Sequence, residues 1–271
     1  MTKEVKSERT LELHVDVDAP IEAAWKALTE AEGIANWFSP IAKVSAPGLN
    51  GEVTVAWSEE MAFTSRVDAW EPNRHVRWIS EDMMGPGTAL ATDFLLEVAG
   101  GKTRIRLVQS GFGESEGWDD LFEGTKTGWT YFLYNLRLYL ETHQGRTRRL
   151  ISERVPVKTP RDAAWKHIAS ATTGVTPAAA NDLKAGDRVR VAFDGGPTAN
   201  GVAEMVVPGK GLAIRLPELM DSVLFIELEG GAPESFHTGW WLSVYDAGRA
   251  KELEAPAKRT FLRIHESMPV K

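Results

Sequence analysis

Apolar and polar residues alternate over much of the first half of the chain, a pattern that predicts β-strands. In the segment 52–57, for example, Val53, Val55 and Trp57 are each separated by one polar or small residue. The same alternation predicts strands at residues 11–17, 52–57, 63–70, 75–80, 89–98 and 103–109. Strands of this kind have one covered and one solvated face, which is typical of an antiparallel sheet.

Helical segments are predicted on both sides of these strands. A helix over 21–29 follows Pro20, since the first turn of a helix tolerates proline, and a short helical turn is expected around 33–38. A long helix is predicted over 119–143, and its apolar stripe consists of Trp129, Phe132, Leu133, Leu136 and Leu140. A long helix packed on one antiparallel sheet makes the predicted fold class α+β.

The chain contains an internal repeat. Residues 15–28 read VDVDAPIEAAWKAL and residues 155–168 read VPVKTPRDAAWKHI. Further pairs follow in the same order: 51–57 with 186–193, 67–72 with 203–208, 94–100 with 224–230, and Gly128-Trp129 with Gly239-Trp240. We therefore expect two tandem domains, 1–148 and 149–271, each closed by a helix that begins near its Gly-Trp step.

The two copies are unequal. The second is shorter before its Gly-Trp step, so we expect it to lack a counterpart of the strand 103–109, and the alternating segment 259–265 is a candidate replacement. Residues 1–148 carry 15 basic and 23 acidic residues, and seven of the ten tryptophans lie there. The first copy is therefore the candidate for function, and the second is expected to be a degenerate partner.

Composition excludes several classes of protein. The 271 residues include no cysteine, which excludes disulfides, iron–sulfur clusters, thiolate zinc sites and thiol nucleophiles. A net charge of −7 disfavours nucleic-acid binding, which depends on neutralising phosphates. No apolar run approaches the roughly 20 residues that span a bilayer, and the first ten residues lack the apolar core of a signal peptide. We expect a soluble, cytoplasmic protein, and the sequence leaves a homodimer open.

Residues 25–38, WKALTEAEGIANWF, resemble the opening motif of the AHSA1-like branch of the START/Bet v 1-like (SRPBCC) superfamily. The Gly-x-Val-x-Val strand from Gly51, the Glu71-Pro72 turn and the Gly128-Trp129 step follow in the family's order, whereas the second copy lacks the Trp-Phe pair. The resemblance implies a helix-grip fold, in which a curved antiparallel sheet holds a long C-terminal helix with a cavity between them. It also implies binding of hydrophobic small molecules, and some relatives are cyclases or aromatases.

Aromatic residues form the candidate ligand site. A hollow lined by aromatic rings with few polar groups is typical of a small-molecule pocket. The predicted ligand-binding residues are Trp37, Phe38, Trp57, Phe63, Trp78, Phe94, Trp129, Phe132 and Leu133. Met61, Met83 and Met84 are candidates for an adaptable rim.

The sequence shows no catalytic, metal-binding or cofactor-binding motif. The six histidines are scattered, and His14 is expected on the solvated face of an edge strand. Arg66, Asp93 and Arg106 are expected to form a charge ladder that faces outward. Acidic pairs at Glu59-Glu60, Glu81-Asp82 and Asp119-Asp120 could do acid–base work only if they were buried.

Three functional hypotheses follow. The first is non-enzymatic binding of a hydrophobic or aromatic small molecule in the first domain. The second is a cyclase- or hydrolase-type enzyme that uses the same cavity and requires an ionisable group inside it. The third is an interaction module, associated with a chaperone such as Hsp90, that acts through the acidic surface of the first copy.

Overall fold

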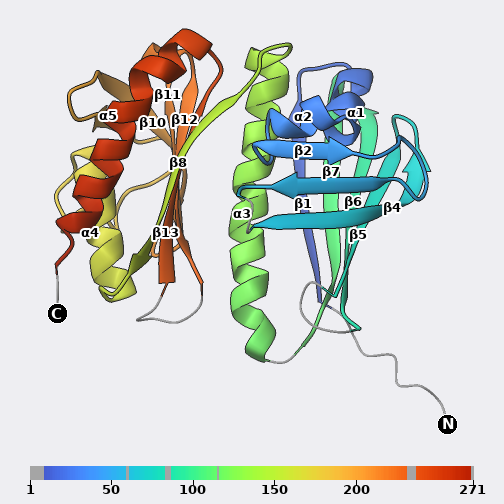
Figure 1. The fold of residues 1–271 in the computed structure, drawn as a ribbon, viewed down its shortest axis with the longest axis horizontal. Coiled ribbons are helices and arrows are strands. Elements are labelled where there is room, and N and C mark those ends of the chain that lie inside the picture. Colours follow the sequence, from blue (N-terminus) through green and yellow to red (C-terminus); the bar gives the residue numbers. More distant parts are fainter. Residues whose placement is uncertain (1–8, 59–60, 83–86, 115, 231–235, 270–271) are drawn as a thin grey trace. The chain divides into compact units, whose positions relative to one another are not determined.

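The computed structural model describes residues 9–58, 61–82, 87–114, 116–230 and 236–269 (Figure 1). The chain divides into two compact units, Met1–Arg146 and Thr147–Lys271. This division lies two residues before the boundary expected from the repeat. Each unit is described below by itself.

The first unit contains a seven-stranded sheet whose neighbouring strands are all antiparallel, in the order β1-β7-β6-β5-β4-β3-β2. The strands are β1 (Arg9–Val17), β2 (Ile41–Val44), β3 (Glu52–Ala56), β4 (Ala62–Glu71), β5 (His75–Glu81), β6 (Ala89–Ala99) and β7 (Lys102–Phe112). Helices α1 (Ile21–Thr29) and α2 (Ala31–Ala35) connect β1 to β2. The unit ends with the short turn η1 (Glu116–Trp118), the long helix α3 (Asp119–Leu138) and the π-helical turn η2 (Tyr139–His143).

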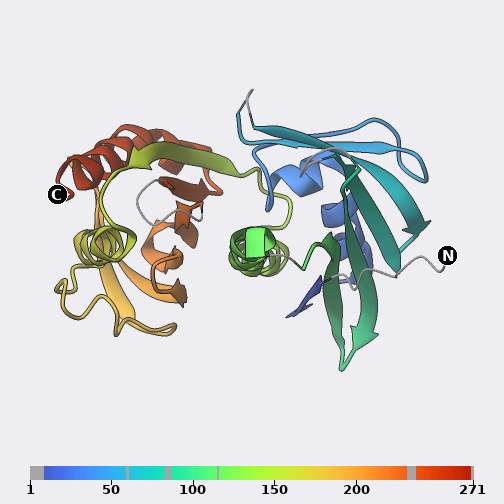
Figure 2. The same ribbon diagram turned by 90° about the horizontal axis from the view of Figure 1, so that it is seen from below.

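The register of the strands aligns buried residues across the inner face of the first sheet. Val67, Trp78, Thr92 and Gln109 lie directly opposite one another across β4, β5, β6 and β7, and all four are buried. Figure 2 shows α3 almost end-on and the strands of this sheet bent rather than flat. The predicted α+β, helix-grip class is confirmed: a curved antiparallel sheet and a long terminal helix enclose the core of the unit.

The second unit repeats this plan with six antiparallel strands, in the order β8-β13-β12-β11-β10-β9. Its strands are β8 (Arg149–Val157), β9 (Arg188–Ala192), β10 (Thr198–Val207), β11 (Gly211–Leu216), β12 (Ser222–Glu229) and β13 (Phe236–Val244). Helix α4 (Arg161–Thr173) follows β8, the short turn η3 (Pro217–Leu219) separates β11 from β12, and α5 (Ala247–Glu266) closes the unit.

The strand orders match when β8 is paired with β1 and β13 with β7, and this corrects the expected difference between the copies. The second unit does have a counterpart of the strand 103–109, namely β13. Within the described residues, the strand without a counterpart is β2. Gly239 and Trp240 lie in β13 rather than at a helix start, because Phe236, Thr238, Trp240 and Leu242 are buried at every second position.

The segment 259–265 is helical, so its expectation as a replacement strand was wrong. It lies within α5, whose buried residues Leu253, Ala257, Phe261 and Ile264 recur three or four positions apart. That spacing places them on one stripe of a helix. In the first unit, the short strand β2 was not predicted, because four residues are too few to establish an alternating pattern.

The corner between α1 and α2 depends on a glycine. A Cβ atom at Gly33 would overlap the carbonyl oxygen of Lys26 and lie 2.7 Å from the Cα of Ala27. The absence of a side chain therefore allows α2 to fold back on α1. Because Trp37 and Phe38 follow directly, this corner also sets where their rings enter the core.

We predict that Gly33→Ala lowers the free energy of unfolding by about 1–3 kcal/mol, because the added methyl group meets backbone that cannot move easily. The matched control is Gly124→Ala within α3, where a Cβ would meet nothing within 4 Å. That substitution should raise stability by up to about 1 kcal/mol, since alanine favours helix over glycine. Urea unfolding followed by tryptophan fluorescence measures both, and equal effects of the two substitutions would contradict the proposed corner.

Candidate functional site

Aromatic rings from the α2 corner, the sheet and α3 meet around Phe38. The ring of Phe38 lies 4.6 Å from Phe132 and 5.1 Å from Trp129, both on α3. It lies 5.2 Å from Trp57, which follows β3, and 6.4 Å from Trp78 on β5. The ring contacts of Phe38 therefore join the helix to the sheet.

Three further rings extend this group. Phe94 on β6 lies 4.9 Å from Trp78, 5.8 Å from Trp129 and 6.3 Å from Trp37, while Phe63 on β4 lies 6.3 Å from Trp57. The structure thus brings eight of the nine predicted site residues into one ring cluster, consisting of Trp37, Phe38, Trp57, Phe63, Trp78, Phe94, Trp129 and Phe132.

Leu133, the ninth predicted residue, lies elsewhere. It lines a shallow groove of about 180 Å³ between β1 and α3, together with Leu13 and Val15. The lining of this groove includes none of the eight rings. Leu133 shares the apolar stripe of α3, but it packs toward the edge strand.

The ring cluster extends from the core of the unit to its surface. Trp37 and Phe94 are 0% exposed, and Trp78 and Trp129 are also buried. Phe38, Trp57 and Phe132 are half-buried, and Phe63 is 39% exposed.

Met61, one of the three candidate rim residues, is half-buried and accepts a hydrogen bond from the backbone of Trp57 through its carbonyl oxygen (3.0 Å). Met83 and Met84 lie outside the described residues.

The buried indole N–H groups of the ring cluster differ in their partners. Trp37 donates from Nε1 to the carbonyl oxygen of Ala27 (2.8 Å), which fastens the corner after α2 to α1. Trp129 donates to Oε1 of Gln109 at 2.6 Å, which links α3 to β7. The Nε1 of Trp78 is buried but has no hydrogen-bond partner within the described residues. Sequence reasoning gave no signal for this difference.

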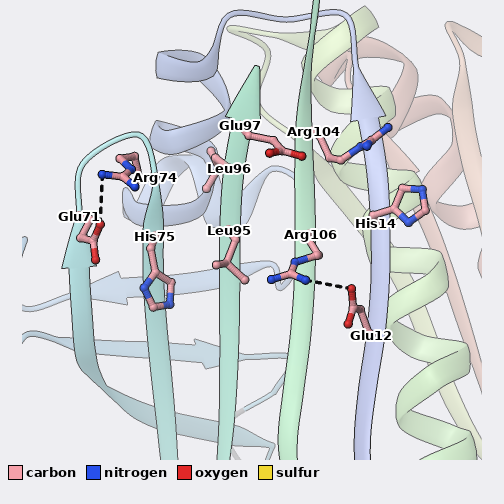
Figure 3. A pocket seen from close by; sticks show the side chains of 10 residues that line it. All are labelled: Glu12, His14, Glu71, Arg74, His75, Leu95, Leu96, Glu97, Arg104 and Arg106. Atoms are coloured by element: carbon pink, nitrogen blue, oxygen red, sulfur yellow. Dashed lines mark hydrogen bonds and ion pairs between the residues drawn. The ribbon is translucent and has the colours of Figure 1, made fainter. Parts of the chain in front are cut away.

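The opposite face of the first sheet is charged and carries a hollow of about 680 Å³. Figure 3 shows the side chains that line this hollow. These side chains come from β1, β4, β5, β6 and β7 and from the turn between β4 and β5, and they are Glu12, His14, Glu71, Arg74, His75, Leu95, Leu96, Glu97, Arg104 and Arg106. Most of the charges there are paired: Arg104 lies 2.7 Å from Asp16, and Arg106 lies 3.2 Å from Glu12. The hydrogen bond from Arg104 lowers the pKa of Asp16.

The predicted outward charge ladder is found in part: Arg66 and Arg106 form charged pairs, whereas Asp93 is buried rather than outward-facing. Arg66 lies 3.0 Å from Asp68, and a hydrogen bond to that carboxylate raises the pKa of Arg66. Asp93 accepts hydrogen bonds from Arg77 (2.7 Å) and is 2.6 Å from Nε2 of His75. His14 is exposed on the edge strand β1, as expected.

The three acidic pairs do not form a buried acid–base site in the described part of the chain. Asp119 is paired with Arg9 at 2.6 Å. Glu81 lies 3.6 Å from Arg66, and Asp82 accepts a hydrogen bond from the backbone of Gly87. Glu59 and Glu60 lie outside the described residues. Among those described, no group of His, Asp or Glu side chains has an arrangement that could hold a metal ion.

The interior of the second unit is packed differently. Trp240 on β13 stacks on Phe261 of α5 with ring centroids 4.9 Å apart, and both are 0% exposed. The described residues between α4 and β9 form turns rather than a helix such as α2. The second unit therefore lacks the corner that supplies Trp37 and Phe38 in the first.

A comparison with protein families gives a match for the first unit. Residues 18–141 match the family described as Activator of Hsp90 ATPase homolog 1-like protein, AHSA1. This match covers most of the first unit, which is called the AHSA1 unit below. The resemblance seen in the sequence motif of residues 25–38 is thereby confirmed for the AHSA1 unit.

Three solved structures are similar to the chain. The Aha1 dimer from Colwellia psychrerythraea is 23% identical, with 51% of this chain and 99% of that chain covered and a TM-score of 0.43. Protein MLL2253 from Mesorhizobium loti is 23% identical, with coverages of 49% and 96% and a TM-score of 0.43. The di-domain ARO/CYC protein BexL from the BE-7585A biosynthetic pathway is 16% identical, with coverages of 96% and 94% and a TM-score of 0.46.

No curated protein matches the chain. Within the described residues of the AHSA1 unit and of the second unit, no helix combines the length and the apolar character needed to cross a bilayer.

We predict that Gln109→Met destabilises the AHSA1 unit by about 1–3 kcal/mol, because the buried Nε1 of Trp129 loses its acceptor. The control is Gln144→Met, at an exposed position after η2. Urea unfolding of the full chain measures both. A Gln109 variant as stable as the Gln144 variant would show that the bond between α3 and β7 contributes little.

A second prediction concerns pH and the second unit. Burial raises the pKa of Glu227 to about 8, and the negative charge of Glu229 adds to the shift. The folded state then binds a proton that the unfolded state releases near pH 4.5, so stability should fall as the pH rises from about 4.5 to 8. Glu227→Gln should remove this part of the pH dependence of thermal unfolding. Glu254→Gln, at an exposed position of α5, should retain it.

Proposed function

We propose that the first unit binds an apolar, aromatic small molecule against the ring cluster and does not convert it chemically. The observation that carries this proposal is the exposure of the rings. Four lie buried, whereas Phe38, Trp57 and Phe132 are half-buried and Phe63 is 39% exposed. Large rings that gather at a surface are a common sign of a binding site, because their contact with water is unfavourable.

The expected affinity follows from the buried area. A guest that buries about 300 Å² of apolar surface gains on the order of 7 kcal/mol at about 25 cal/mol per Å². Losses of translational and rotational freedom reduce this value. Dissociation constants between micromolar and millimolar are therefore expected without any charged contact.

The chemistry of the ring cluster favours binding over acid–base catalysis. None of its eight side chains is ionisable. Two polar side chains that contact it are amides: Gln109 accepts from Trp129, and Asn135 donates to the carbonyl oxygen of Trp37 at 3.0 Å. A third is the buried phenol of Tyr131, whose ring lies 5.4 Å from Phe132 and whose hydroxyl accepts from Asn135 at 3.3 Å. A general acid or base needs a group that exchanges a proton near the working pH. This requirement disfavours the cyclase or hydrolase alternative.

We also propose that residues 149–271 form a second domain that does not hold the same kind of guest. The stacked rings of Trp240 and Phe261 occupy the interior between its sheet and α5. A filled interior of this kind supports a stabilising role for the second copy.

The test uses the fluorescent probe N-phenyl-1-naphthylamine, whose emission rises in an apolar site. The wild-type chain should bind it, and the double substitution Trp129→Ala and Phe132→Ala should weaken binding at least tenfold, because it removes two walls of the ring cluster. Circular dichroism and urea unfolding confirm that each variant is folded.

The matched control is Trp70→Ala with Phe122→Ala. These rings pack outside the ring cluster, Trp70 against Trp25 and Phe122 against Phe112. The control should bind the probe within about twofold of wild type. Equal loss in both double variants, or no binding by the wild-type chain, would refute the proposed site.

A further inference from the structure

We infer that the guest of the ring cluster carries a neutral hydrogen-bond acceptor that meets Nε1 of Trp78. This inference rests on the proposed function and adds a chemical class to it: an aromatic compound bearing a carbonyl, ether or ring-nitrogen acceptor. The structural reason is the one buried indole donor of the ring cluster that has no partner within the described residues.

The position of Trp78 places this donor within the candidate site. Its side chain is 5% exposed and projects from the middle of β5, opposite Val67 on one side and Thr92 on the other. Its ring contacts Phe94 at 4.9 Å and Phe38 at 6.4 Å. An acceptor that reaches the Trp78 ring from within the ring cluster must therefore come with a guest that contacts the same rings.

The other two buried indole donors show what a satisfied group looks like in this unit. Trp37 donates to Ala27 and Trp129 donates to Gln109, at 2.8 Å and 2.6 Å. Buried donors in folded proteins nearly always have a partner, because an unpaired one loses its bond to water without compensation. Within the described residues three buried indole donors depart from this rule, namely Trp78 and, in the second unit, Trp165 and Trp240. Of these, Trp78 is the one that lies in the ring cluster, where a guest is expected.

The acceptor is expected to be uncharged. None of the ring-cluster residues is cationic, and the arginines Arg104 and Arg106 lie on the opposite face of the sheet, where each is paired with a carboxylate. A carboxylate brought into the rings would lose its hydration without gaining a counter-charge. A ketone, ester or aryl ether meets one N–H donor at much lower cost.

The experiment compares two probes of nearly the same shape, 2-acetylnaphthalene and 2-ethylnaphthalene, of which only the first has a carbonyl oxygen. Each is titrated to displace N-phenyl-1-naphthylamine from the wild-type chain and from Trp78→Phe, which keeps an aromatic ring but removes the N–H. The ratio of the two dissociation constants is taken for each protein, so that the different hydration of the probes cancels between proteins.

We expect the preference for the acetyl probe to be about five- to thirtyfold greater in the wild-type chain than in Trp78→Phe, as the loss of one buried hydrogen bond predicts. The smaller ring of phenylalanine changes the apolar contact with both probes alike, so this change cancels in the ratio. Trp70→Phe is the matched control: it also removes an indole N–H, but from a ring that packs against Trp25 outside the ring cluster. It should leave the preference unchanged within about twofold.

The outcomes separate the inference from the proposed function. If neither naphthalene displaces the reporter from the wild-type chain, the proposed function fails. If both bind and the preference is the same in Trp78→Phe, the proposed function stands and the inference is wrong.

The nitrogen-15 spectrum of the wild-type chain gives a second measurement that needs no variant. The indole N–H resonance of Trp78 should move downfield with 2-acetylnaphthalene and not with 2-ethylnaphthalene, and no movement with either bound probe would overturn the inference.

Discussion

The contacts of the Phe38 ring hold the candidate site together. This one side chain touches Trp129 and Phe132 on the helix and Trp57 and Trp78 on the sheet side. Its position is fixed from behind, where the neighbouring Trp37 is bonded to α1 and α2 folds closely over that helix. The position in which this corner places one phenyl ring therefore decides how the rings of the helix meet those of the sheet.

The two copies show how the presence of that corner changes a unit. The first has α2 and β2 after its first helix, whereas the described residues of the second pass from α4 through turns to β9. Without the corner, its interior is filled by a strand tryptophan stacked on a helix phenylalanine. The rest of the strand order is the same in both sheets. The two units thus differ both in the segment that follows their first helix and in the rings that fill their interior.

Much of the first unit could be predicted from the sequence, because local periodicity and burial agree there. The alternation at Val53 and Val55 became β3, and eight of the nine predicted site residues came together. The predictions were wrong where a short segment fits both the two-residue period of a strand and the 3.6-residue period of a helix. Phe261 lies in the segment 259–265, in which apolar and polar residues alternate. Over the longer stretch from Leu253, however, the buried residues have the spacing of a helix. The unpaired N–H of Trp78 could not be predicted at all, since hydrogen-bond partners depend on tertiary distances.

The close spacing of the tryptophans in the ring cluster has an optical consequence. Trp57, Trp78 and Trp129 all contact the ring of Phe38, so their indoles lie near enough to exchange excitation energy. A single guest that absorbs at the emission wavelength of tryptophan would then quench the fluorescence of several indoles. The tryptophan fluorescence of this unit therefore depends on several indoles together. One bound guest would reduce its intensity by more than the number of rings in contact with the guest suggests.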